Sequence, residues 1–189
     1  MRQKAWRGGG GMSLPDDDGG RHLGVARPDD PSLVHLAVVG DTYTVLLSGE
    51  QTAGRFALID MLIPAGGGPP PHRHNFEECF HVLEGSVEVT LRNEPPVGLE
   101  AGETVNIPAN APHSFRNSDD VPARLLCTAV PAGLEAYFAE FGDRVKSRTS
   151  PPPDLSDEEK QARLRHAVAL APEFGMEILL ASGAQADAT

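Results

Sequence analysis

Two stretches of this chain, GGGPPPHRHNFEECFHVLEG (66–85) and GETVNIPANAPHSFRN (102–117), contain histidine motifs whose spacings together predict one metal site. The first motif places two histidines and two glutamates within seven residues, and the second adds one more histidine. Three imidazoles and one carboxylate suit a borderline divalent metal ion. The candidate ligands are His72, His74, Glu78 and His113.

Side-chain alternation along a strand decides which glutamate we expect at the metal. β-favouring residues flank a glycine turn signal, so we expect residues 72–91 to form a hairpin. Residues of equal parity share one face of a strand. His72, His74 and Glu78 share parity and should point the same way. Glu77 has the opposite parity and should point away from the metal.

The second motif is expected to bring the fourth ligand beside the first three. Thr104–Ile107 reads as a strand, and residues 108–112 are too rich in proline and asparagine to continue it. A new strand that begins at His113 can then lie next to the predicted hairpin.

These motifs resemble those of the cupin superfamily. The one departure is Asn110, where the pattern usually has glycine, and asparagine tolerates the positive φ that such a turn requires. More closely, residues 40–74 and the helical tail resemble small single-domain bacterial cupins described as quercetin dioxygenase-like. Nine of the ten signature positions are present: Gly66, His72, His74, Glu78, Gly85, Gly102, Pro108, His113 and Asn117.

The resemblance implies an all-β fold, a jelly-roll barrel or double-stranded β-helix, followed by a C-terminal pair of α-helices. Short predicted strands with turns about every ten residues favour a barrel or sandwich independently of the resemblance. We predict a disordered segment over residues 1–32, a barrel over 33–131, and a helical extension over 132–189 that packs on the barrel. The predicted strands are Val34–Val39, Thr42–Leu47, Arg55–Ile63, Glu78–Gly85, Val87–Arg92, Thr104–Ile107, His113–Asn117 and Ala123–Val130.

The tail changes from strand to helix periodicity. Apolar residues over 134–141 recur at helical spacing, and Gly142 should end that helix. Ser156 and Glu159 form a capping-box signature for a second helix. Residues 176–180 could close the chain as a short strand.

Composition limits the partners. The net charge of −11 argues against nucleic acid and anionic membranes. No apolar run reaches the ~20 residues that span a bilayer. The basic start of the chain lacks a signal-peptide core, and translation could begin at Met1 or Met12. Two cysteines imply no disulfide framework, so we expect a cytoplasmic protein. Sheet edges and amphipathic helices favour a homodimer.

Other residues have less specific expectations. His22 and His35 should be surface or tail residues, and His81 and His166 should be structural or solvated. Cys79 should be a small core residue. A weaker prediction concerns the apolar lining of a substrate pocket, with the candidates Met61, Phe76, Phe80 and Phe115.

The resemblance implies a metal-dependent dioxygenase of a small cyclic or phenolic, flavonol-like compound. Glu78 would then be both ligand and catalytic base. One divalent metal per chain is expected, and Fe, Mn, Ni, Cu and Zn all remain open. Two alternatives also remain: a metal-dependent isomerase, epimerase or lyase, and a small-molecule binding module without turnover.

Overall fold

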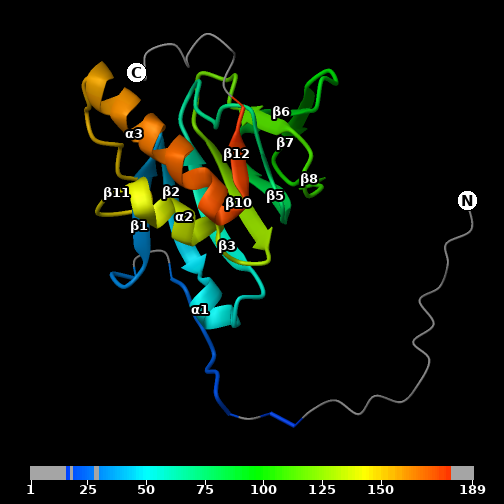
Figure 1. Ribbon diagram of the computed structural model, residues 1–189, viewed down its shortest axis with the longest axis vertical. Coiled ribbons are helices and arrows are strands. Elements are labelled where there is room, and N and C mark those ends of the chain that lie inside the picture. Colours follow the sequence, from blue (N-terminus) through cyan, green and yellow to red (C-terminus); the bar gives the residue numbers. More distant parts are fainter. Residues whose placement is uncertain (1–15, 18, 28–29, 180–189) are drawn as a thin grey trace, which may run out of the picture.

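Two antiparallel β-sheets form the body of the computed structural model, which describes residues 16–17, 19–27 and 30–179 (Figure 1). The larger sheet has seven strands in the order β11 (Asp143–Arg144), β1 (Val34–Val38), β2 (Asp41–Leu47), β3 (Ala57–Ile63), β10 (Ala123–Val130), β5 (Glu77–Glu84) and β8 (Thr104–Ile107). The smaller sheet has five, in the order β12 (Met176–Ile178), β4 (His72–His74), β9 (His113–Arg116), β6 (Ser86–Leu91) and β7 (Val97–Glu100). This is the predicted all-β jelly roll.

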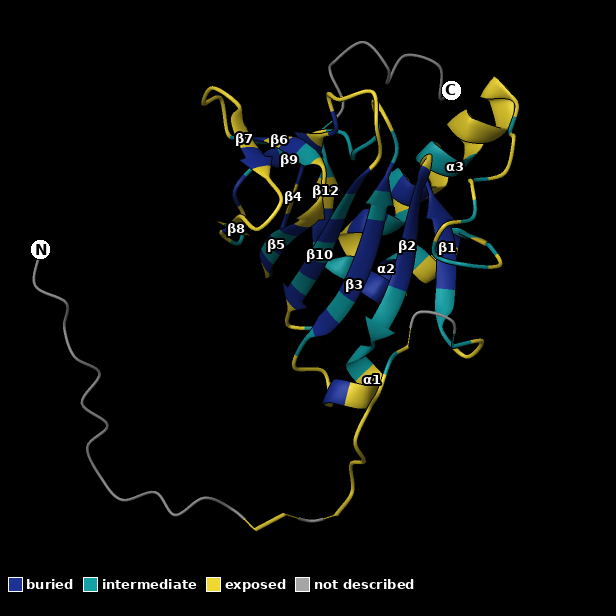
Figure 2. Ribbon diagram, turned by 180° about the vertical axis from the view of Figure 1, so that it is seen from behind, coloured by how far each residue is buried: buried dark blue, intermediate teal, exposed yellow. Residues whose placement is uncertain are grey.

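Alternating burial explains why the long strands form where they do. In β10 every second side chain is buried, because successive residues point to opposite faces. β3 has apolar residues at both parities: its odd-numbered side chains are buried, and Leu58 and Leu62 on its other face are half-buried. Buried residues run along β1, β2 and β3 of the larger sheet (Figure 2). All eight predicted strands are confirmed to within two residues at either end, while β7 and β11 were not predicted and β4 was expected only as the start of the hairpin over residues 72–91.

The predicted hairpin over residues 72–91 is wrong. β4 and β6 belong to the smaller sheet and β5 to the larger one, so the chain changes sheet twice in this stretch. Gly85 makes the second change at a φ of 73°, where an added Cβ would lie 3.0 Å from the Cα of Ala123. Burial nevertheless alternates without interruption from His72 to Val82, so the parity argument survives the first change of sheet.

A glycine turn and a buried asparagine join the two sheets near the predicted site. Asn117 is fully buried, and its Nδ2 donates to the carbonyls of Ile63 at 3.0 Å and Val121 at 2.8 Å. At Gly68, which has a φ of 125°, an added Cβ would lie 2.2 Å from the carbonyl oxygen of Phe115. Only glycine permits this approach of the turn to β9. Asn110 has a φ of 66°, as its place in the second motif predicted.

The helices follow their predicted signals. α2 (Leu134–Phe141) ends at Gly142, and α3 (Asp157–Leu170) begins after Ser156, whose capping box with Glu159 is formed. A four-residue helix, α1 (Gly49–Thr52), was not predicted, although Ser48 and Gln51 form a second capping box there. Both longer helices lie over one face of the larger sheet (Figure 1).

The tail returns to the smaller sheet after α3. The 3₁₀-helix η1 (Ala171–Phe174) leads into β12, which pairs with β4 so that Met176 lies opposite His74 and Ile178 opposite His72. Leu180, at the end of the predicted strand, lies outside the described residues. The predicted segment 1–32 also falls partly outside them, and the proposed domain boundaries stay predictions.

None of the described helices combines the length and the hydrophobicity that a transmembrane span requires.

Candidate metal centre

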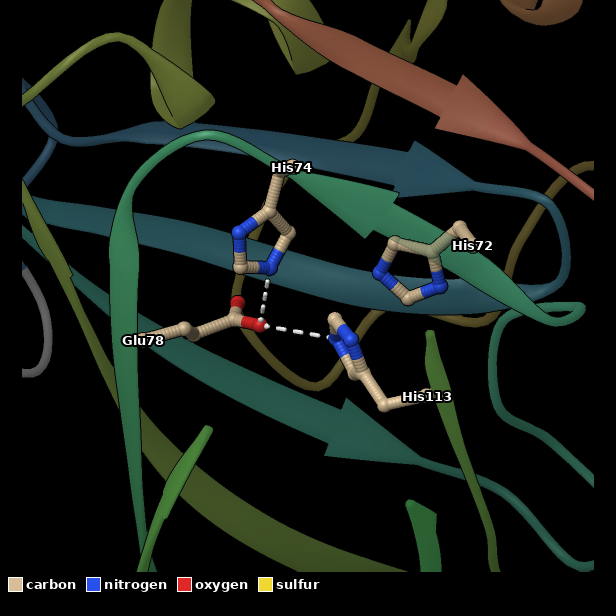
Figure 3. A group of neighbouring side chains, drawn as sticks. All are labelled: His72, His74, Glu78 and His113. Atoms are coloured by element: carbon tan, nitrogen blue, oxygen red, sulfur yellow. Dashed lines mark hydrogen bonds and ion pairs between the residues drawn. The ribbon is translucent and has the colours of Figure 1, made fainter. Parts of the chain in front are cut away.

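The four predicted ligands meet in one place. β4 supplies His72 and His74, β5 supplies Glu78, and β9 supplies His113 (Figure 3). One potential ligand atom from each residue lies within 4.8 Å of all the others, and all four side chains are buried. Donors from three strands in two sheets therefore converge on a volume that one ion could occupy.

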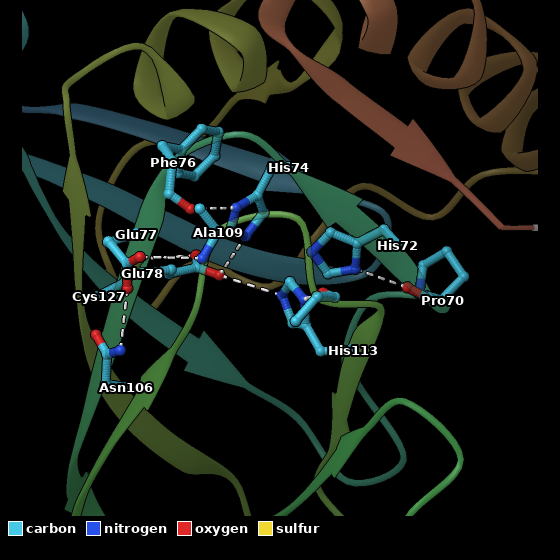
Figure 4. A network of polar contacts seen from close by, with 11 residues as sticks. Pro70, His72, His74, Phe76, Glu77, Glu78, Asn106, Ala109, His113 and Cys127 are labelled. Carbon is cyan, nitrogen blue, oxygen red and sulfur yellow. Dashed lines mark hydrogen bonds and ion pairs between the residues drawn. The ribbon is translucent and has the colours of Figure 1, made fainter.

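Backbone carbonyls fix the orientation of all three imidazole rings (Figure 4). In each ring Nδ1 lies within hydrogen-bond distance of a carbonyl oxygen two residues away, so Nδ1 carries the proton. A ring held in this way offers the lone pair of Nε2, which is how metal-binding histidines are usually oriented. The pairs are His72 with Pro70 at 2.9 Å, His74 with Phe76 at 2.8 Å, and His113 with Ala111 at 3.0 Å.

The carboxylate of Glu78 lies among these lone pairs. Its Oε2 is 3.1 Å from Nε2 of His74 and 3.4 Å from Nε2 of His113 (Figure 3). The second contact lacks hydrogen-bond geometry, and Nε2 of His113 is a buried atom without a partner among the described residues. Acceptor atoms directed at one another need a cation or a proton between them. The donor set therefore fits a divalent metal.

The charge states of two ligands suit that role. Burial, followed by the nearby His113, lowers the pKa of His72 to about 4, so its imidazole is neutral at pH 7. Burial alone would raise the pKa of Glu78, but a proton shared with Nε2 of His113 or His74 lowers it below its ordinary value. A neutral imidazole and an anionic carboxylate are the forms that bind a metal.

Sequence reasoning missed Cys127, which positions Glu78. Its thiol donates to Oε1 of Glu78 at 3.2 Å, which leaves Oε2 to face the histidines (Figure 4). Burial raises the pKa of the Cys127 thiol, so it stays protonated and remains a donor. Alternation along β10 could have revealed it, because Cys127 is buried between Leu125 and Ala129 on the inward face.

Removing this donor should weaken metal binding. Groups that orient a metal ligand are typically worth 10–100-fold in affinity, so we expect Cys127→Ala to raise the metal dissociation constant by about tenfold. Cys127→Ser, which keeps a donor, should recover most of the loss. The measurement is titration of zinc against a chelator of known affinity. Cys79→Ala is the matched control, and equal affinities for Cys127→Ala and Cys79→Ala would contradict the role.

The neighbouring acidic and histidine residues lie where parity places them. Glu77 is exposed and accepts hydrogen bonds from Asn106 at 3.0 Å and from the backbone of Ala109 at 3.1 Å, so it fastens the turn before β9 (Figure 4). The ring of His81 instead contacts the hydroxyl of Thr104 at 2.8 Å.

Among the remaining histidines, one expectation was wrong. His22 and His166 are exposed, as predicted. His35, however, is buried on β1, where its Nδ1 lies 2.8 Å from the hydroxyl of Thr44. The pairing of β1 with β2 creates this partner, and the position of His35 near the start of the chain gave no sign of it.

A small cavity of about 60 Å³ opens on the site, with His72 and Glu78 in its wall. Three of the four predicted lining residues, Met61, Phe80 and Phe115, do line it. Phe76 does not, because its ring stacks on His74 with centroids 3.9 Å apart. The helices and β12 complete the wall, with Leu134, Tyr137, Phe138, Phe141, Leu164, Ala167, Met176 and Ile178. The cavity is therefore mostly apolar apart from the metal site, Asp41 and Tyr43.

The family follows from this combination of fold and ligands. The Cupin domain family matches residues 59–129, a range that contains all four ligands. The chain belongs to the cupin superfamily. An RmlC-like cupin from Shewanella frigidimarina superposes with a TM-score of 0.51 over 61% of this chain and 97% of that one, at 15% identity, which shows the shared fold.

Sequence relatives cover this cupin only in part. An uncharacterized protein of Methanocaldococcus jannaschii is 34% identical over 40% of this chain and 60% of its own length. Quercetin 2,3-dioxygenase from Bacillus subtilis is 30% identical over 68% of this chain and 37% of its own length. The chain thus matches less than two thirds of either relative.

Proposed function

We propose that this cupin is a metal-dependent oxidoreductase, a dioxygenase of a small cyclic or phenolic compound that binds through a chelating enol or hydroxyl group. One divalent ion per chain would be held by His72, His74, Glu78 and His113. The observation that carries the proposal is the buried cluster of lone pairs, which opens on an apolar cavity.

The residues of the site would have two roles, to bind the metal ion and to accept a proton from the substrate. A divalent metal bound here would supply a Lewis acid that lowers the pKa of a chelated hydroxyl and, if redox-active, a centre for dioxygen chemistry. Glu78 accepts the hydroxyl proton on Oε2, while the Cys127 thiol keeps Oε1 in place. Phe80 and Phe115, whose rings lie 5.1 Å apart, exclude water from the same space.

The similarity to a quercetin 2,3-dioxygenase supports oxygen chemistry on this site, because it extends over two thirds of this chain. The fold alone would not support oxygen chemistry, since proteins with the same barrel fold catalyse many different reactions. The relative is much longer than the region matched, so its reaction is only a proposal for this chain.

The volume of the cavity at the metal site limits the size of the substrate that could bind. Sites for drug-sized ligands usually measure ~300–1,000 Å³, far more than the 60 Å³ found here. A compact hydroxy-ketone, enol or catechol would need less rearrangement than a flavonol. A flavonol would have to displace part of the wall that α2, α3 and β12 provide.

We expect the metal-loaded protein to consume dioxygen only when a chelating compound is present. The measurement is oxygen-electrode turnover with Fe, Mn, Ni, Cu or Zn and a panel of enol-ketones, catechols and flavonols, normalised to bound metal. Compact members should react faster than flavonols. The quadruple variant His72→Ala, His74→Ala, Glu78→Ala and His113→Ala is the background control.

No oxygen uptake with any metal across the panel would contradict the dioxygenase proposal. Metal-dependent conversion of a substrate without oxygen uptake would instead indicate an isomerase or lyase, and tight binding without conversion would indicate a binding module.

A further inference from the structure

Asp41, the first residue of β2, is a buried acid with one oxygen left free. Asp41 is only 2% exposed to solvent. The hydroxyl of Tyr43 donates to Oδ2 at 3.0 Å. Oδ1 is buried and has no hydrogen-bond partner among the described residues. A carboxyl oxygen in this position has lost its hydration without compensation, which costs free energy.

This oxygen lies beside the glycine turn that faces the cavity. An added Cβ on Gly67 would come within 2.5 Å of Oδ1, so glycine is what leaves room for the carboxyl group. The backbone N–H of Gly68 is near enough to lower the pKa of Asp41, but it does not form a hydrogen bond with Oδ1. The contact with the turn therefore does not satisfy the free oxygen.

Asp41 and the metal ligands share one cavity. Asp41, Tyr43, His72 and Glu78 all belong to its wall. The charge of Glu78 is among the causes that raise the pKa of the Tyr43 phenol, after burial and Asp41 itself. Asp41 and the two metal ligands are therefore polar groups in a wall whose other side chains are mostly apolar.

An apolar residue at this position would avoid the cost of burying a carboxyl group. Burial is the main cause that raises the pKa of Asp41 from 3.8 to about 7, so the folded protein disfavours its ionised form. Buried acids of this kind lower stability and gather at functional sites, where a ligand supplies the missing partner.

We propose that Asp41, oriented by Tyr43, is a second polar contact of the cavity, and that its Oδ1 binds a hydroxyl group of a ligand whose other end chelates the metal. The ligand class is a small molecule with a chelating group and a separate hydroxyl, joined by an apolar part that matches the Met61 and Phe115 walls. The inference rests on the proposed binding of chelating compounds, but not on their oxidation.

The test uses the zinc-loaded full-length protein and matched hydroxamate chelators. One series ends in a hydroxyl, the other has a methyl group at that position, and both vary the number of intervening methylenes. Dissociation constants come from calorimetry, with zinc retention checked by elemental analysis. At one chain length the hydroxyl compound should bind roughly three- to tenfold more tightly than its methyl counterpart, as expected for one buried hydrogen bond.

Asp41→Leu should remove this preference while both series still bind through the metal. Tyr43→Phe, which takes away only the hydroxyl that holds Oδ2, should reduce the preference and keeps the test decisive if Asp41→Leu does not fold. Thr42→Val, on the opposite face of β2, is the matched control and should retain the full preference.

Equal affinity of both series for the wild-type protein at every chain length would overturn the role of Asp41. An undiminished hydroxyl preference in Asp41→Leu would overturn it as well. If Asp41→Leu does not fold, the same result in Tyr43→Phe would do so. These results would leave the proposed function standing if oxygen uptake is observed. Conversely, a hydroxyl preference without any oxygen uptake would contradict the dioxygenase and support the contact. Failure of every hydroxamate to bind would overturn both.

Discussion

Alanine in place of His113 should remove most of the divalent metal from the purified protein. His113 supplies one of the three imidazoles that gather around Glu78, and its Nε2 is a buried atom without a hydrogen-bond partner among the described residues. Loss of a group that only orients a ligand already costs about 10–100-fold in affinity, so loss of the ligand itself should exceed that range. Elemental analysis after gel filtration, with zinc affinity from chelator competition, measures the effect.

His81→Ala is the matched control for this result. His81 lies on the same strand as Glu78 but contacts Thr104, and its substitution should leave metal content nearly unchanged. If His81→Ala lost as much metal as His113→Ala, the assignment of ligands by strand parity would be wrong. Absence of metal from the wild-type protein, even after reconstitution with Fe, Mn, Ni, Cu or Zn, would contradict the site itself.

Substitution of Glu78 by glutamine should lower turnover far more than metal content. Three imidazoles still hold the ion, but the amide cannot accept the substrate proton or offset the metal's charge. General-base assistance is worth about 10²–10⁴ in rate, and we expect a loss of that size at matched metal occupancy. The measurement is oxygen uptake per bound metal with the most reactive compound of the panel.

Glu77→Gln provides the comparison, since Glu77 is the neighbouring carboxylate on the outer face of the same strand. Its amide retains an acceptor for the Asn106 contact, and the variant should keep nearly full turnover. Unchanged turnover in Glu78→Gln would reject the base role and leave Glu78 as a ligand only.

The ligand set could be predicted because a strand has a fixed period. Parity selected Glu78 over Glu77, and burial in the structure alternates as that argument requires. The left-handed turn at Asn110 and the capping box at Ser156 were also predictable, since each depends on a few neighbouring residues.

Contacts between distant segments could not be predicted in this way. The period of a strand is the same in either sheet, so parity could not show that the chain changes sheet between His74 and Glu78. Phe76 was placed on the cavity wall by parity, yet it packs behind His74 because it lies at that change of sheet.

By itself, the sequence determined which side chains face inward, and therefore the four candidate ligands, while the cupin barrel around them was predicted from the resemblance of the two motifs. Only the tertiary structure decided what meets those ligands. It brought the Cys127 thiol to Glu78, the tail strand to His72 and His74, and Asp41 into the wall of the same cavity. Periodicity and capping act over a few residues, whereas these contacts join residues up to 106 positions apart, and their placement depends on how the whole chain closes.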